Sequence, residues 1–184
     1  LFNTPRALSE EEIRDIIARF AYAAKVCKES GFTGVQIHGA HGYLVSQFLS
    51  PTHNQRNDQW GGSLENRMRF VKEVYLAIRQ AVGDTFPIGI KLNSADFQKG
   101  GFTQEDSMEV VKHLSELGMD LIEISGGTYE APAMMGAAQK ESTKMREAYF
   151  LTYCEEVRKR VSCPLMLTGG FRSAEGMNAA LASG

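Results

Sequence analysis

The sequence predicts an α/β fold in which four parallel strands alternate with helices, and three observations support this prediction. Four short apolar runs are separated by segments with the 3.6-residue apolar period of amphipathic helices. Each run is apolar almost throughout, which is typical of strands covered on both faces. Strands separated by helices pair in parallel through right-handed crossovers. A complete (β/α)8 barrel needs about 250 residues, so the 184 residues of this chain predict a partial (β/α)8 TIM barrel, a half barrel. A small open sheet is the alternative.

The N-terminal part of the chain predicts one helix and one strand. Ser9 stands three residues before Glu12, which is the spacing of a helix-capping box. Apolar residues then recur at helical spacing until Gly31, a residue type that commonly ends helices. A short apolar run at 35–37 follows and predicts a buried strand. We therefore expect a helix that leads directly into the first strand.

A long polar loop is predicted before the next long helix. Residues 44–49 form a short apolar helical turn, and residues 51–63 are too polar and too rich in glycine for regular structure. Ser63 is a good N-cap for a helix that ends at Gly83. Long loops in compact α/β domains are often functional or are held down by their own hydrogen bonds.

The second half of the chain predicts three further strands, at 87–93, 120–124 and 164–168. Helices are predicted at 103–118, at about 146–161 and at 173–184, and no period is visible between 128 and 143. Polar residues gather after the C-terminal ends of the strands. In a parallel α/β barrel the active site lies at that end.

Composition and charge exclude several classes of function. The net charge of −2 and the lack of a basic stripe disfavour nucleic-acid binding. No apolar run approaches the ~20 residues that cross a bilayer, and no signal peptide opens the chain. The cysteines, Cys27, Cys154 and Cys163, are scattered and odd in number, as is typical of reduced thiols. We therefore expect a cytoplasmic protein that binds neither nucleic acid nor a membrane.

The first strand runs into a segment, residues 38–43, that predicts chemistry at the C-terminal end of the strand. His38, His41 and Tyr43 stand there among small residues, so that a flat ligand can approach the backbone closely. The His-x-x-His spacing also suits half of a metal site. No carboxylate or cysteine stands at ligand spacing nearby, so we expect no metal. Histidines hydrogen-bonded by backbone carbonyls are the structural alternative.

Five motifs follow one another along the chain: HGAHGYL at 38–44, N-x-R-x-D-x-x-G-G-S-x-x-N-R at 54–67, KLNS at 91–94, EISGG at 123–127 and TGGF at 168–171. In this order they resemble the Old Yellow Enzyme family. The members of this family are FMN-dependent ene reductases and NADH:flavin oxidoreductases on a (β/α)8 barrel. By this resemblance the four strands correspond to strands four to seven of the barrel.

The resemblance implies roles for the residues of the first motif. In the family the two histidines, here His38 and His41, bind the carbonyl oxygen of the substrate, and the tyrosine, here Tyr43, donates a proton. Hydride delivered from reduced FMN to the β-carbon of an activated alkene leaves enolate charge on that oxygen, which two preplaced donors stabilise. A tyrosine, with an ordinary pKa of about 10, is protonated at neutral pH and can serve as the acid. The implied reaction is the reduction of α,β-unsaturated carbonyl compounds, with NAD(P)H as the reductant.

The resemblance also implies which residues hold FMN. Lys91 stands where the family has a basic residue beside N1 and the C2 carbonyl of the flavin. Gly169 and Gly170 precede a helix that begins near Ser173, and bare backbone N–H groups at a helix start suit the FMN phosphate. Two alternatives stay open for Lys91. It is a lysine whose head reaches solvent from a strand end, or a Schiff-base nucleophile of an aldolase.

By the same resemblance, residues 1–184 form a partial FMN-binding barrel domain that is truncated at both ends. Open strand edges and an apolar inner face would favour self-association, for example as a homodimer. A catalytically incompetent fragment or self-associating module is therefore the alternative function. We interpret Arg56, Asp58 and Arg67 as a structural ion-pair network, and residues 128–143 as a loop that faces the substrate.

Overall fold

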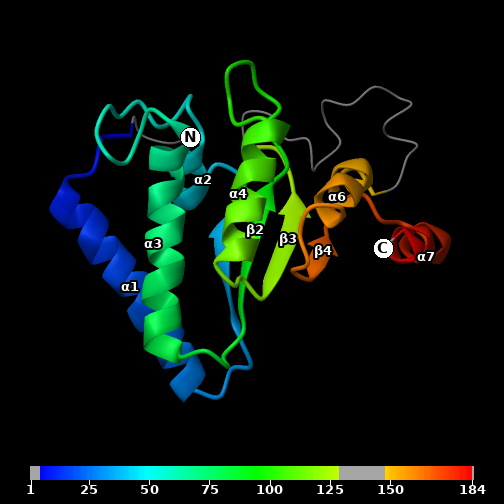
Figure 1. Cartoon of the computed structure of the whole chain (residues 1–184), viewed down its shortest axis with the longest axis horizontal. Coiled ribbons are helices and arrows are strands. Elements are labelled where there is room, and N and C mark those ends of the chain that lie inside the picture. The colour runs from blue at the N-terminus through cyan, green and yellow to red at the C-terminus, as the bar shows by residue number, and fades with distance from the viewer. Residues whose placement is uncertain (1–4, 129–147, 184) are drawn as a thin grey trace.

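The computed structural model describes residues 5–128 and 148–183, and there the predicted alternation of strands and helices is confirmed (Figure 1). The strands are β1 (Val35–Gly39), β2 (Ile88–Asn93), β3 (Leu121–Ser125) and β4 (Leu165–Leu167). The helices are α1 (Glu10–Glu29), α2 (Leu44–Leu49), α3 (Leu64–Val82), α4 (Gln104–Glu116), α6 (Leu151–Arg158) and α7 (Ala174–Ala182). The predicted start of a helix near 146, and all but the first residue of the segment 128–143, lie outside the described residues.

The four strands form one parallel sheet in the order β1-β2-β3-β4. Figure 1 shows α3, α4 and α6 on the same side of this sheet, with α1 packed against α3. A doubly wound open sheet would reverse its strand order and carry helices on both faces. Sequential parallel strands with helices on one side are the arrangement of a barrel section, so the prediction of a partial barrel is confirmed.

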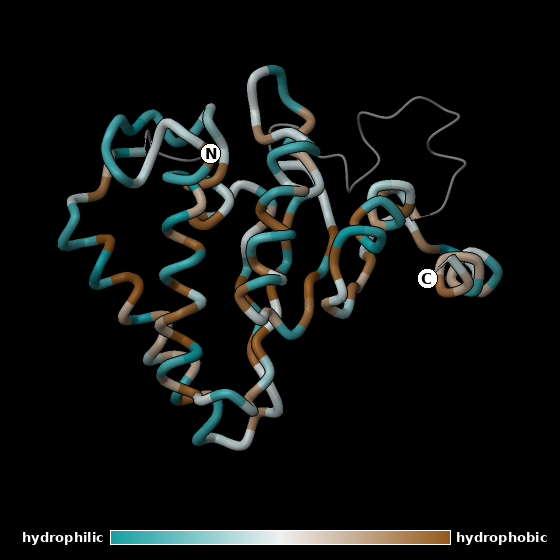
Figure 2. The backbone as a smooth tube through the Cα atoms, viewed as in Figure 1, coloured by the Kyte–Doolittle hydropathy of each residue, from teal (hydrophilic) through white to brown (hydrophobic). Residues whose placement is uncertain are grey.

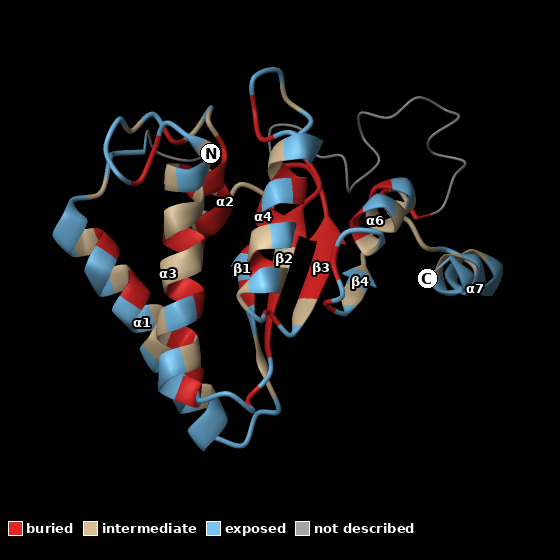
Figure 3. Ribbon diagram, in the orientation of Figure 1, coloured by how far each residue is buried: buried red, intermediate tan, exposed pale blue. Residues whose placement is uncertain are grey.

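The core lies between the sheet and the helices on that side. The strand residues that face the helices are fully buried: Ile37 is 2% exposed, and Ile90 and Ile122 are 0% exposed. Figure 3 shows burial concentrated on β2 and β3, and Figure 2 shows hydrophobic and hydrophilic residues alternating along α1, α3 and α4. The apolar face of each helix therefore packs toward the sheet or toward its neighbour, as the helical period predicts.

Helix N-termini occur where the capping residues predict them. Ser9 Oγ accepts a hydrogen bond from the Glu12 amide at 3.2 Å, and the Glu12 carboxylate accepts one from the Ser9 amide at 2.8 Å. Side chains at three other predicted starts also accept a bond from a backbone N–H in the first turn: Ser63, Thr103 and Ser173. Each bond satisfies a donor that the helix itself leaves unpaired.

The other side of the sheet carries polar side chains. In a strand successive side chains point to opposite faces, and parallel partners in register share a face. His38 pairs in register with Lys91, Lys91 with Glu123, and Glu123 with Met166. We call these four residues, with Gln36, the open face. Gln36 and His38 are exposed and Met166 is 40% exposed, in contrast to the buried isoleucines on the opposite side.

Candidate active site

The structure brings together four of the residues that the sequence singles out: His38, His41, Tyr43 and Lys91. The ring of His38 lies 4.8 Å from the ring of Tyr43 and 5.7 Å from that of His41, measured between centroids. Lys91 is the in-register neighbour of His38 on β2. We call His38, His41, Tyr43, Lys91 and Glu123 the mouth cluster, because it lies at and beyond the C-terminal half of the strands.

A tight turn after β1 places His41 and Tyr43. His41 has a φ of 63°, in the left-handed region that a non-glycine residue enters at a cost. Its amide donates to Asn93 Oδ1 at 3.2 Å, and this buried amide side chain comes from the end of β2. Gly39 lies so close to β2 that a Cβ there would meet the Lys91 carbonyl oxygen at 2.9 Å. The neighbouring strand therefore dictates the path of the turn.

An ion pair crosses the open face. Lys91 Nζ lies 2.9 Å from Glu123 Oε1, and Gln36 Nε2 donates to Glu123 Oε2 at 2.9 Å. Burial by itself would raise the pKa of Glu123, but the hydrogen bonds from Lys91 and Gln36 outweigh it and hold the pKa below its ordinary value. Glu123 is therefore a carboxylate at neutral pH, and it fixes the position of the Lys91 ammonium.

The two histidines are neutral at neutral pH. Partial burial of the ring, and then the nearby Lys91 ammonium, lower the pKa of His38 below its ordinary value. Burial also lowers the pKa of His41; a hydrogen bond to the Gly127 carbonyl opposes this shift, and Lys91 adds to it. Neutral imidazoles carry one N–H donor each, and the neighbouring Tyr43 is 45% exposed.

The predicted phosphate-binding glycines lie elsewhere on the sheet. Gly169 and Gly170 follow β4, two strands away from Lys91. Their φ angles are 109° and 78°, and a Cβ at position 170 would meet the ring of Tyr149 at 2.7 Å. Positive φ and this close approach both require glycine. Thr168, directly before these glycines, hydrogen-bonds the Glu123 carboxylate of the mouth cluster through its side chain. The role of the two glycines stays a prediction.

The residues present fit FMN in two respects. Lys91 offers a fixed cation on the open face, suited to an electron-rich edge of a ring system. Gly169 and Gly170 offer backbone without side chains beside the nine-residue helix α7, suited to a phosphate. Among the described residues, no group of three or more His, Cys, Asp or Glu side chains is placed to hold a metal ion.

Sequence reasoning missed Glu123 and Gln36 as members of the site. Both stand in runs expected to be buried strands, where an uncompensated polar group is costly. A glutamate in the middle of an otherwise apolar strand is the available signal, and it becomes interpretable only with the register that sets Lys91 beside it. Glu123 and Gln36 are 87 residues apart in sequence.

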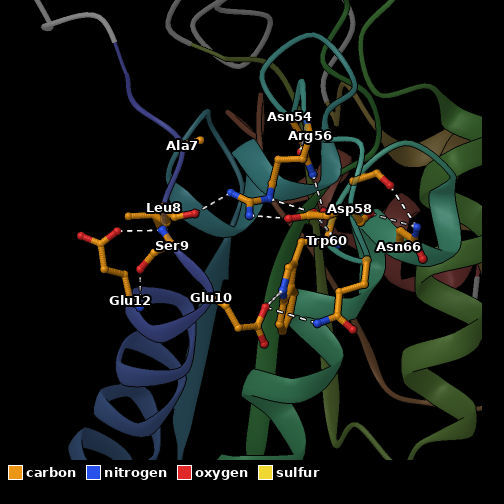
Figure 4. Close-up of polar contacts among 12 residues, drawn as sticks. Ala7, Leu8, Ser9, Glu10, Glu12, Asn54, Arg56, Asp58, Trp60 and Asn66 are labelled. Atoms are coloured by element: carbon orange, nitrogen blue, oxygen red, sulfur yellow. Dashed lines mark hydrogen bonds and ion pairs between the residues drawn. The ribbon is translucent and has the colours of Figure 1, made fainter.

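Of the predicted ion-pair network, Arg56 and Asp58 pair within the long loop (Figure 4), whereas Arg67 pairs with Asp106 of α4 instead. Arg56 donates to Asp58 at 2.6 and 3.1 Å and to the Leu8 carbonyl at 2.8 Å, and Trp60 Nε1 donates to Glu10. Arg67, 6% exposed, donates to Asp106 at 3.2 Å and to carbonyl oxygens of the preceding segment. We call this set the loop cluster: Glu10, Arg56, Asp58, Trp60 and Arg67. It ties the loop to the start of α1 and to α4.

The sequence matches a known protein family and several of its members. The model of the NADH:flavin oxidoreductase / NADH oxidase family matches residues 2–184. The chain is 40% identical to an NADH-dependent flavin oxidoreductase of Neonectria sp. over 100% of its own length and 25% of the relative's. It is 42% identical to an NADH-dependent flavin oxidoreductase of Aspergillus parasiticus over 96% of its own length and 40% of the relative's.

Solved structures show the same fold. A 2-naphthoyl-CoA reductase superposes with a TM-score of 0.89 at 33% identity, covering 97% of this chain and 27% of that one. An old yellow enzyme homologue from Zymomonas mobilis superposes with a TM-score of 0.75 at 26% identity, covering 99% of this chain and 48% of that one. The chain thus spans between a quarter and a half of the length of these proteins. No helix among the described residues is long and apolar enough to span a bilayer.

Proposed function

Because the chain belongs to the NADH:flavin oxidoreductase / NADH oxidase family, we propose that it supplies the substrate-binding and proton-donating side of an FMN-dependent active site. The proposed reaction is the NAD(P)H-dependent reduction of the activated C=C bond of α,β-unsaturated carbonyl compounds. The observation that carries this proposal is the convergence of His38, His41 and Tyr43 beside the Lys91 ammonium.

The histidines bind and polarise the carbonyl oxygen of the substrate. When bound, FMN reduced by NAD(P)H would supply the hydride that the β-carbon receives. Negative charge then builds on the carbonyl oxygen, and imidazole N–H donors already in place stabilise it more than they stabilise the ground state. The lowered pKa values of His38 and His41 keep both rings neutral donors at neutral pH.

Tyr43 is the acid in this proposal. Its phenol proton passes to the α-carbon as the enolate collapses to the saturated carbonyl compound, and the hydride plus this proton account for the two hydrogens gained. Tyr43 caps α2 from the same turn that carries His41, so the acid and the oxygen-binding groups are placed together. Its 45% exposure leaves the ring accessible to a substrate on the open face.

Lys91, Gly169 and Gly170 would hold the cofactor. Lys91 would bind the electron-rich edge of the flavin, and its ion pair with Glu123 keeps the ammonium in position. The two glycines would bind the phosphate through backbone N–H groups. The ion pair also weighs against the Schiff-base alternative for Lys91, because a nucleophilic amine must be uncharged.

A self-associating module remains the second candidate function. The supporting observation is apolar exposure near the C-terminal end of the sheet: Met166 is 40%, Met177 48% and Leu181 79% exposed. Exposed apolar groups next to the open edge of β4 favour association. Analytical ultracentrifugation of the purified chain tests this second candidate. A self-associating module should form a dimer whose fraction rises with concentration, and a monomer at all concentrations would contradict it.

The experiment for the proposed function is enone reduction with a matched tyrosine control. In flavin-loaded protein, Tyr43→Phe should lower the rate of NAD(P)H-dependent reduction of 2-cyclohexenone by about 100-fold or more, the range for loss of a general acid. Tyr22→Phe, at a 69% exposed tyrosine of α1, should leave the rate unchanged. Full rate in Tyr43→Phe would show that this phenol is not the acid.

A further inference from the structure

One carboxylate of the open face, that of Glu123, is bound from all the other strands or their ends. Gln36 of β1 donates to its Oε2 at 2.9 Å, and Lys91 Nζ of β2 lies 2.9 Å from its Oε1. Thr168, directly after β4, adds a side-chain hydrogen bond. Burial by itself would raise the pKa of Glu123, but these donors hold it below its ordinary value. A charged carboxylate is therefore fixed in the middle of the open face at neutral pH.

The ion pair presents its two charges unequally. The Lys91 side chain is 20% exposed, whereas that of Glu123 is 8% exposed. A ligand on the open face therefore reaches Lys91, while the carboxylate lies beneath it. Lys91 and Glu123 are the charged members of the open face, so their charges sum to zero. The attraction of the ammonium for an anionic ligand is reduced by the opposite charge 2.9 Å away.

These two charges matter for a flavin because its own charge changes on reduction. FMN that takes up a hydride from NAD(P)H, without a further proton, gains one negative charge, and it loses that charge when the hydride passes on to the β-carbon. A nearby cation stabilises the reduced form and raises the reduction potential, and a nearby anion does the opposite. In the proposed function Lys91 would bind the electron-rich edge of the flavin. Both members of the ion pair would then act on the potential, with opposite signs.

We propose that Glu123 is the counter-charge of the flavin site: its carboxylate offsets part of the Lys91 charge, lowers the reduction potential of bound FMN and so makes the reduced flavin a stronger hydride donor. This inference rests on the proposed function. It gives Glu123 an effect opposite in sign to that of holding Lys91 in place. A glutamine would still accept a hydrogen bond from the ammonium, but it would leave the positive charge without an opposing one.

The first experiment is a dye-coupled reductive titration of the FMN-loaded chain at pH 7. Glu123→Gln should raise the ratio of reduced to oxidised flavin at a given potential by about tenfold, the order of effect of a unit charge in a partly buried site. For a two-electron couple this corresponds to about 30 mV. Glu109→Gln removes the same charge from an exposed position on α4 and should leave the potential unchanged. A lowered potential in Glu123→Gln would show that the carboxylate acts by positioning Lys91, and a lowered or unchanged value overturns the proposal.

A second variant keeps the experiment decisive if Glu123→Gln does not fold. Lys91→Gln combined with Glu123→Gln leaves neither partner as an unpaired charge in the sheet. With no ammonium left to position, the second substitution changes the potential through the carboxylate charge. The double variant should therefore have a higher potential than Lys91→Gln alone, and equal potentials contradict the proposal.

The reach of the carboxylate charge is also measurable without flavin. Burial and then the Lys91 ammonium lower the pKa of His38, and Glu123 raises it. Glu123→Gln should therefore lower the pKa of His38 in an NMR titration of the flavin-free chain, and Glu109→Gln should not. An unchanged His38 pKa in Glu123→Gln would show that the carboxylate charge does not act across the open face, which overturns the proposal.

The outcomes separate this inference from the proposed function. An FMN-loaded chain that shows these shifts but reduces no enone contradicts the proposed function alone. Normal enone reduction with an unchanged potential in Glu123→Gln contradicts this inference alone. A chain that binds no FMN contradicts both.

Discussion

The loop cluster and the mouth cluster are both dense in polar side chains, but they differ in what those side chains contact. In the loop cluster the guanidinium groups of Arg56 and Arg67 end on carboxylates and backbone carbonyls of the protein. In the mouth cluster the rings of His38 and Tyr43 lie at an exposed surface. Motif matching marks both segments equally. The geometry separates guanidinium groups that stabilise the fold from an exposed imidazole, that of His38, which a ligand can reach.

Glu123 shows where the two kinds of cluster overlap. Its carboxylate is buried and paired, as in the loop cluster, but its partner Lys91 stands on the open face. A buried ion pair is weak evidence for stability, because desolvation offsets much of its attraction. Here it fixes a cation beside two histidines, and this placement is the better account of why a glutamate occupies the middle of β3.

The largest expected difference between the clusters is in stability. Arg67→Ala should lower the free energy of unfolding by about 3 kcal/mol, because it leaves Asp106 without its partner and buried carbonyl oxygens without a donor. His38→Ala should lower it by less than about 1.5 kcal/mol, because the ring is exposed and loses only ring contacts. Urea unfolding followed by circular dichroism measures both. Equal losses of unfolding free energy in the two variants would contradict the distinction between a structural loop cluster and an exposed mouth cluster.

A smaller effect is expected at the ion pair of the open face. Glu123→Gln should lower the free energy of unfolding by about 1.5 kcal/mol at pH 7, since a hydrogen bond between charged groups is lost. Glu109→Gln, at an exposed glutamate of α4, is the control and should have no effect.

The pH dependence of that loss has a definite sign. The pKa of Glu123 is lowered by folding, so its contribution is present above the unfolded value of about 4.3 and disappears as the pH falls through the folded value. In unfolding curves measured at a series of pH values, the difference between wild type and Glu123→Gln should therefore be constant above about pH 4.3 and shrink as the pH falls below it. A difference that does not change with pH would assign the effect to packing.

The smallest expected effect is on histidine titration. Lys91→Gln should raise the pKa of both His38 and His41, because a neighbouring cation no longer disfavours the imidazolium forms. Lys112→Gln, at an exposed lysine of α4, should change neither. NMR titration of the imidazole C–H signals measures the shift. If both variants titrate like wild type, the charge of Lys91 does not reach the histidines.

The same lowered values predict how stability depends on pH near neutrality. Between the folded pKa of each histidine and its ordinary value of about 6.5, the unfolded chain binds more protons than the folded one. The contribution of the two histidines is therefore complete above pH 6.5 and declines as the pH falls below it. Replacing both histidines should flatten this part of the stability profile, as measured by urea unfolding.

Local sequence signals were sufficient for most of the fold. Apolar periodicity and the capping serines at 9, 63 and 173 placed the helices, because these signals act within a few residues. Boundaries were less exact: β1 extends to Gly39, beyond the expected end at 37, and within the described residues α6 begins at Leu151. Strand ends depend on pairing with a neighbour, which no local pattern encodes.

The site was predictable only in part. The pattern of residues 38–43 predicted His38, His41 and Tyr43 as site residues, and the family resemblance added Lys91. Their partners come from another strand, β3: Glu123 pairs with Lys91 of β2, and Ser125 Oγ lies 3.3 Å from His41 Nε2, 84 residues away in sequence. Such contacts follow from strand register, so they become visible only in the folded molecule.

The most direct test of the contrast between the clusters is FMN binding by one variant from each. FMN is titrated into the purified chain and its binding is followed by flavin fluorescence. Lys91→Gln should bind FMN at least about tenfold more weakly than wild type, since a charged contact is lost. Arg56→Gln should lose stability yet bind FMN within about twofold of wild type, because its contacts lie in the loop. Equal affinity in Lys91→Gln and wild type, or a loss confined to Arg56→Gln, would contradict the assignment of the open face as the flavin site.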